Sequence, residues 1–107
     1  MMEFIIISTI IFADPGLNLT PYLEILPAEC PVRIDILARN NKFYDGFAYF
    51  SGRIMIFDGN NLSISRKKWV LAHELGHICG AKSRFFYGKR EEISDFYAEN
   101  WLKNKIS

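Results

Sequence analysis

The chain has 107 residues, half of them hydrophobic, with 13 Lys and Arg against 12 Asp and Glu. This length fits one small domain, residues 1–107, and excludes a multidomain assembly, while the apolar fraction excludes intrinsic disorder. A net charge of +1 leaves no electrostatic surplus for a phosphate backbone, so we expect no nucleic-acid partner. The longest basic run, Arg66 to Lys68, is expected to be the solvated first turn of a helix.

The first expected element is a buried strand from Phe4 to Phe12, because this stretch is short and rich in β-branched residues. It is too short to cross a bilayer, which takes about 20 apolar residues. Glu3 stands where a signal peptide would carry a basic residue. We therefore expect a retained strand, no membrane span and a cytoplasmic protein.

A short helix and a second strand follow. Thr20 and Pro21 suit the N-cap and the first position of a helix that Pro27 ends. Apolar and polar residues then alternate from Val32 to Ala38, which predicts a half-buried strand.

The next segment predicts a hairpin. Two β-prone runs, Phe47 to Phe50 and Arg53 to Phe57, flank Ser51 and Gly52. A pair of such residues between two strands is typical of a tight two-residue turn.

The apolar spacing then changes from two residues to three or four, which predicts a helix from about Arg66 to Cys79. Ser65 is the expected N-cap, with Ile64 packing on Trp69 as a hydrophobic staple, and Gly80 is the expected C-terminal cap. Because the apolar residues form two stripes, we expect this helix to be packed on most sides.

The two cysteines, Cys30 and Cys79, lack the paired spacing of a zinc ribbon. We expect both to pack as buried thiols. A single disulfide between them is also compatible with the sequence.

The predicted central helix contains an H-E-x-x-H motif, formed by His73, Glu74 and His77. Residues four apart are neighbours on one helix face, so the two imidazoles can bind one metal ion. Zn²⁺ suits them, because it accepts neutral nitrogen and, with three protein ligands, keeps a fourth position for water. Glu74 is the candidate general base. The alternative, an ordinary polar helix surface, is disfavoured by the two apolar stripes.

The third ligand separates the subclasses that use this motif. Metzincins place a histidine where this chain has Ser83, which excludes that subclass. Downstream, a last helix is expected from about Lys89 to Lys103, and it begins with Glu-Glu-Ile-Ser-Asp at positions 91–95.

This second segment resembles the E-x-x-S/A-D motif of the gluzincins, the thermolysin-like peptidases. The resemblance implies that Glu91 is the third zinc ligand and that Asp95 accepts the other N–H of a metal-binding histidine, His73. Glu91 and Asp95 also share one helix face, as this arrangement needs. Glu92 is the fallback ligand, and an ordinary surface acid is the alternative for Asp95.

The short chain resembles the minigluzincins, which are single-domain proteins of about this length. That resemblance implies an α+β, zincin-like fold: a small sheet of three to four strands packed on a backing helix, an active-site helix and a C-terminal glutamate helix. It also implies a zinc metallopeptidase, an endopeptidase with one Zn²⁺ per chain, in which Glu74 deprotonates a zinc-bound water. We expect a peptide or protein substrate that adds to an exposed sheet edge, with Arg53 to Phe57 as the candidate strand.

Three questions stay open at this level. Tyr87 and Arg84 are candidates for stabilising the oxyanion, although a packed aromatic loop explains Tyr87 equally well. The zinc site can also be catalytically idle and serve a regulatory or interaction domain. Finally, the protein can be a latent zymogen, or self-associate, if the C-terminal segment from Lys103 to Ser107 occupies the cleft.

Overall fold

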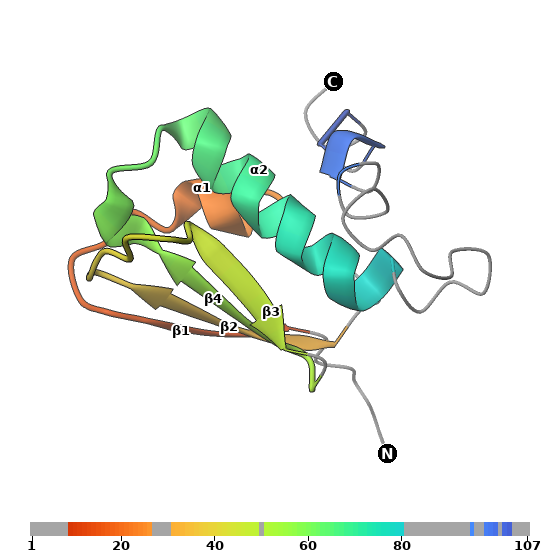
Figure 1. The fold of residues 1–107 in the computed structure, drawn as a ribbon, viewed down its shortest axis with the longest axis horizontal. Helices are drawn as coiled ribbons and strands as arrows, with labels where there is room; N and C mark the ends of the chain where they lie inside the picture. The colour runs from red at the N-terminus through yellow and green to blue at the C-terminus, as the bar shows by residue number, and fades with distance from the viewer. Residues whose placement is uncertain are drawn as a thin grey trace, which may run out of the picture.

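A computed structural model describes residues 9–26, 31–49, 51–80, 95, 98–100 and 102–103. They form an α+β fold in which a four-stranded mixed sheet carries its helices on one face (Figure 1). The elements are β1 (Thr9–Ala13), α1 (Thr20–Leu23), β2 (Val32–Leu37), β3 (Gly46–Tyr49), β4 (Arg53–Phe57) and α2 (Ile64–Leu75). Among these residues, no helix combines the length and apolar character that crossing a membrane requires.

The strand order is β1-β2-β4-β3, with β1 and β4 parallel to β2 and with β3 antiparallel to β4. The first predicted strand is observed from Thr9 onward, and its residues 4–8 lie outside the described part. The expectation that β4 forms the edge of the sheet is wrong, because β4 lies between β2 and β3. Two fully buried residues, Ile54 and Ile56, explain its central place. The edge strand on this side is β3.

The hairpin turn is one residue longer than predicted. Tyr49 pairs with Arg53, so three residues connect the strands. Gly52 adopts φ +95° and donates its N–H to the Tyr49 carbonyl at 3.0 Å. A left-handed glycine at the end of the loop is typical of three-residue hairpins, and this glycine sets the longer turn.

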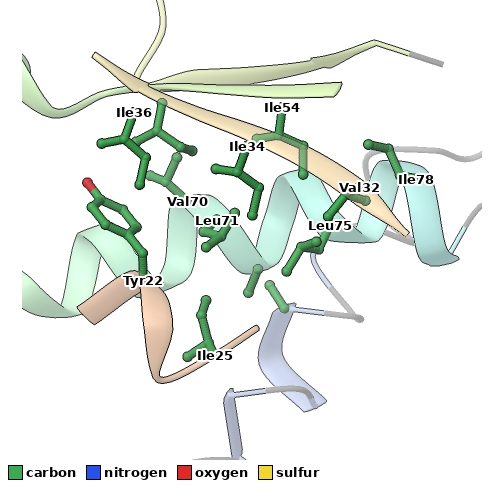
Figure 2. Close-up of a cluster of buried hydrophobic side chains, with 13 residues drawn as sticks. Tyr22, Ile25, Val32, Ile34, Ile36, Ile54, Val70, Leu71, Leu75 and Ile78 are labelled. Atoms are coloured by element: carbon green, nitrogen blue, oxygen red, sulfur yellow. The ribbon is translucent and has the colours of Figure 1, made fainter. Parts of the chain in front are cut away.

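The core lies between the sheet and the helices (Figure 2). Val32, Ile34 and Ile36 of β2 point into it, as the alternation predicts. Burying each such side chain stabilises the fold by about 1.5–3 kcal/mol. Ala98 belongs to the same core, and the described C-terminal residues 95, 98–100 and 102–103 are helical, so the C-terminal helix packs beside α2.

The other face of the sheet carries no helix within the described ranges (Figure 1). Asp35 is buried there between Arg33 and Arg53, whose Nε atoms lie 3.1 and 2.6 Å from its carboxylate oxygens. The Arg33 guanidinium also stacks on the exposed Phe12 ring, 4.2 Å from its centroid. These cations satisfy the buried carboxylate and cover part of the open face.

Helix α1 begins and ends earlier than predicted. Its N-cap is Leu19, and Thr20 is the first helical residue. The Asn18 side chain accepts the Thr20 N–H at 3.2 Å. The Leu19 carbonyl accepts the N–H groups of Tyr22 and Leu23 at 3.0 Å, which are the donors that a threonine cap was expected to serve. The helix ends at Leu23, ahead of Pro27.

Helix α2 also begins earlier, because Ser63 and not Ser65 is its N-cap. The Ser63 hydroxyl accepts the Arg66 N–H at 3.1 Å. Leu62 is the apolar residue here that packs on the core, whereas Ile64 is 60% exposed. The predicted staple therefore does not form, since packing of Leu62 sets where the helix begins.

Candidate metal centre

The motif straddles a change of helical pitch. His73 and Glu74 lie in the last turn of α2, and His77 lies in a π-helical turn, η2 (Gly76–Gly80). The predicted continuous α-helix to Cys79 is therefore α-helical only to Leu75. Such π turns occur frequently at functional sites, because the wider turn re-aims the side chains it carries.

The two histidine rings lie side by side. Their centroids are 5.0 Å apart and the ring planes are inclined at 81°. The structure also brings Asp95 to this pair, with its Oδ1 2.9 Å from His73 Nδ1. A carboxylate that engages Nδ1 fixes the tautomer and leaves Nε2 as the metal-binding nitrogen.

Both histidines and Glu74 line one cavity of about 690 Å³. Residues 41–49, which include the edge strand β3, form one wall, and α2 with its π turn forms the other. Glu74 is 7% exposed. The cavity therefore places two imidazoles and a buried carboxylate beside a sheet edge.

Close packing narrows the cavity where β3 approaches α2. A Cβ added at Gly46 would lie 3.0 Å from Val70 Cγ1 and 2.8 Å from the Met55 carbonyl oxygen. Any larger residue at position 46 would push the strand away from the helix. Gly46 therefore sets the distance between the two walls.

A polar network closes the end of the cavity that lies toward the start of α2. Asp45 accepts from Arg66 Nε at 3.1 Å and from Asn60 Nδ2 at 2.9 Å. Asn60 also donates to the Tyr44 carbonyl and accepts the Asn41 N–H at 2.7 Å. These contacts join the 41–45 loop to α2 and to the 3₁₀ turn η1 (Asp58–Asn60).

Four predicted residues, Glu91, Glu92, Tyr87 and Arg84, lie outside the described residues. Within the described ranges, no three His, Cys, Asp or Glu side chains are grouped so that they can hold a metal ion. The described donors nevertheless suit zinc, because two imidazoles and an orienting carboxylate are the chemistry of its protein sites.

Sequence reasoning missed the role of Trp69. Its indole stacks on the His73 ring with centroids 4.9 Å apart and planes inclined at 22°. The Arg66 guanidinium lies over the Trp69 ring, 5.0 Å from its centroid. The signal was the spacing of four residues between Trp69 and His73, which places the two rings on one helix face.

Cys79 forms a disulfide, so the expectation of a free buried thiol at this position is wrong. The bond lies within the π turn, two residues after His77. The other cysteine of the sequence, Cys30, lies outside the described residues. A covalent anchor thus holds the turn that carries the second histidine.

No protein-family model, curated protein or solved structure matches this chain. The assignment of a function therefore depends on the chemistry of the site itself.

Proposed function

We propose that this protein is a zinc-dependent metallopeptidase of the gluzincin type. The observation that carries the proposal is the meeting of His73, His77 and Glu74 in one cavity, with Asp95 against the first histidine. Polar surface residues would not be gathered beside a sheet edge in this way. The proposed ligands of a single Zn²⁺ are His73, His77 and Glu91.

When bound, zinc supplies a Lewis acid that polarises the scissile carbonyl and lowers the pKa of water. The protein's part begins with orientation. Asp95 Oδ1, which lies 2.9 Å from His73 Nδ1, would orient that imidazole with Nε2 toward the metal. Two histidines and one glutamate leave an open position, which distinguishes a catalytic from a structural zinc site.

Glu74 is the proposed general base. Glu74 is buried in the cavity wall, directly after His73 and three residues before His77 in the sequence. It would take a proton from the attacking water and deliver it to the nitrogen of the leaving amine. Burial of Glu74 strengthens its electrostatic effect on charges that develop in the cavity.

The substrate backbone would pair with β3. Asp45 and Phe57 form a hydrogen-bonded pair, since the Asp45 carbonyl accepts the Phe57 N–H at 2.8 Å. By the alternation of an antiparallel ladder, the N–H and C=O groups of Gly46 and Ala48 point away from β4. These are the groups that an added peptide strand would engage.

The direct test measures zinc content and cleavage of a peptide library by the wild type, by Glu74→Gln and by a chain lacking residues 103–107. We expect one zinc per chain in all three. Glu74→Gln should lose cleavage by about 10²–10⁴-fold, and the shortened chain should cleave at least as fast as the wild type. Zinc without cleavage in every version would instead indicate an idle site in a regulatory domain.

Two neighbouring carboxylates allow a matched test of the third ligand. Glu91→Gln should release zinc, whereas Glu92→Gln should retain it, because the resemblance to the E-x-x-S/A-D motif assigns the ligand to Glu91, four residues before Asp95. Atomic absorption after dialysis measures both. The reverse pattern would assign the ligand to Glu92.

The strand proposal has its own test. Ala48→Pro removes an N–H that faces away from β4, and edge strands tolerate proline at such positions. We expect KM to rise with little change in stability, whereas Ala48→Ser, which keeps the N–H, should behave like the wild type. Equal KM values for both variants would contradict pairing of the substrate with β3.

A further inference from the structure

We propose that Trp69 is a positioning residue for the metal ligand His73. The proposal rests on the function proposed above. It starts from the stacked contact between the two rings, whose centroids are 4.9 Å apart and whose planes are inclined at 22°. Both residues line the same cavity, so the indole covers one face of the ligand at the site itself.

The two neighbours of His73 restrict different motions of its imidazole. Asp95 engages the ring edge at Nδ1, 2.9 Å away, and resists movement along the ring plane. The nearly parallel indole of Trp69 resists rotation of the ring out of that plane. Together the two contacts would restrict the direction in which Nε2 points.

The indole is itself held in place. The Arg66 guanidinium lies 5.0 Å from the Trp69 centroid, in the range of a cation–π contact. Asp45 accepts from that guanidinium at 3.1 Å from both Nε and Nη2. The chain of contacts from the 41–45 loop through Arg66 and Trp69 therefore ends on the zinc ligand.

Two simpler roles make different predictions. If Trp69 only packs the helix, its loss lowers stability and leaves zinc affinity unchanged. If it only forms a wall for substrate, its loss raises KM and leaves zinc affinity unchanged. Positioning of His73 requires that zinc affinity and the geometry of the bound metal change even without substrate.

The first experiment measures zinc dissociation constants of the full chain by competition with a chelator. Trp69→Leu should weaken zinc binding by about 3- to 10-fold, the value of one aromatic contact. Trp69→Phe, which keeps a stacking ring, should restore binding to within about twofold. Phe47→Leu is the matched control, since Phe47 lines the same cavity from β3 and should leave zinc affinity unchanged.

The second measurement uses Co²⁺ as a spectroscopic probe. Trp69→Leu should alter the visible absorption spectrum of the cobalt-loaded protein, and Trp69→Phe should not. Trp101→Phe leaves Trp69 as the only tryptophan, and one equivalent of Co²⁺ should quench most of its fluorescence. This last result does not depend on the folding of any Trp69 variant.

The outcomes separate the two proposals. A wild-type chain that binds no zinc overturns the proposed metallopeptidase and this inference with it. A zinc-binding wild type beside a Trp69→Leu variant with the same affinity and cobalt spectrum overturns only the positioning role. Trp69→Phe as weak as Trp69→Leu, or no quenching at one equivalent of Co²⁺, also overturns it.

Discussion

The helical segment formed by α2 and the π turn η2, residues 64–80, has two halves with different roles. Its first half, residues 64–70, is tied to the rest of the protein by a serine cap and by ion pairs. Each member of the basic run makes one: Arg66 with Asp45, Lys67 with Asp58 and Lys68 with Glu24. The run lies near the start of the helix as expected, and Arg66 is exposed. The expectation that the run is solvated is wrong for Lys67 and Lys68, whose side chains are 12% and 17% exposed.

The second half, residues 71–80, carries the chemistry. It holds both histidines and the buried Glu74, changes to π pitch at Gly76 and ends in the segment that contains the Cys79 disulfide. Anchoring and reactivity are thus separated along one helix. Changes in the first half should alter mainly stability, except at Arg66 and Trp69, whose contacts lead to His73. Changes in the second half should alter metal binding.

The disulfide gives the largest expected effect and tests whether the second half needs a covalent anchor. Cys79→Ser should lower the free energy of unfolding by about 2–4 kcal/mol and should weaken zinc binding, because the π turn also carries His77. Urea unfolding and chelator competition measure the two effects. Reactive thiols in the folded, unreduced protein would contradict the bond and would agree with the expected cytoplasmic location.

Asp95→Asn should change metal binding without changing stability. Loss of the charged partner of His73 Nδ1 should weaken zinc affinity by about 10- to 100-fold, while the half-exposed Asp95 side chain contributes little to folding. Chelator competition measures the zinc affinity, and thermal unfolding measures the stability. Glu99→Gln, at an exposed site on the same helix, is the control that should match the wild type.

Tyr22→Phe tests, through the pH dependence of stability, the contacts of Asp58, which also pairs with Lys67 of the first half. Burial, and then the hydrogen bond and charge of Asp58, raise the pKa of the Tyr22 phenol well above its ordinary value. The folded state therefore holds the phenol proton more tightly than the unfolded state does. The stabilisation that the protonated Tyr22 gives to the fold is complete below about pH 10 and is lost as the pH rises further.

Wild-type stability should consequently fall more steeply than that of Tyr22→Phe between pH 9 and pH 11, as urea unfolding at each pH can measure. At neutral pH the variant should lose about 1–2 kcal/mol and keep its zinc affinity. Parallel pH profiles for the two proteins would contradict a raised pKa of Tyr22.

Lys68→Ala should have the smallest effect. Its partner Glu24 is 55% exposed, and exposed ion pairs contribute less than about 1 kcal/mol. Thermal unfolding at low and high salt measures the loss. A loss above this value would mean that the anchors of the first half act cooperatively.

The local patterns of the sequence were enough to predict the elements near the site. Alternation identified the buried side of β2, and the H-E-x-x-H spacing identified a helix face shared by His73 and His77. Strand order was not accessible in this way, because it depends on long-range packing of β4 between two neighbours.

Other misses come from competition between similar local signals. Ser63 and Ser65 both suit a helix cap, and only the tertiary packing of Leu62 selects Ser63. Similarly, the spacing along the helix allows Trp69 to pack on Ile64 as a hydrophobic staple or to stack on His73. The structure shows the stack on His73.

Among the residues that the structure describes, both walls of the cavity come from one stretch of the sequence, residues 41–78. Two short connections therefore set the width of the cleft: the hairpin turn between β3 and β4, and the segment that runs from β4 through η1 to α2. Length variation before β2 would leave this width unchanged, whereas one inserted residue between β4 and α2 would shift every reactive group relative to the opposite wall. The remainder of the chain supports these walls and adds the Asp95 carboxylate beside His73.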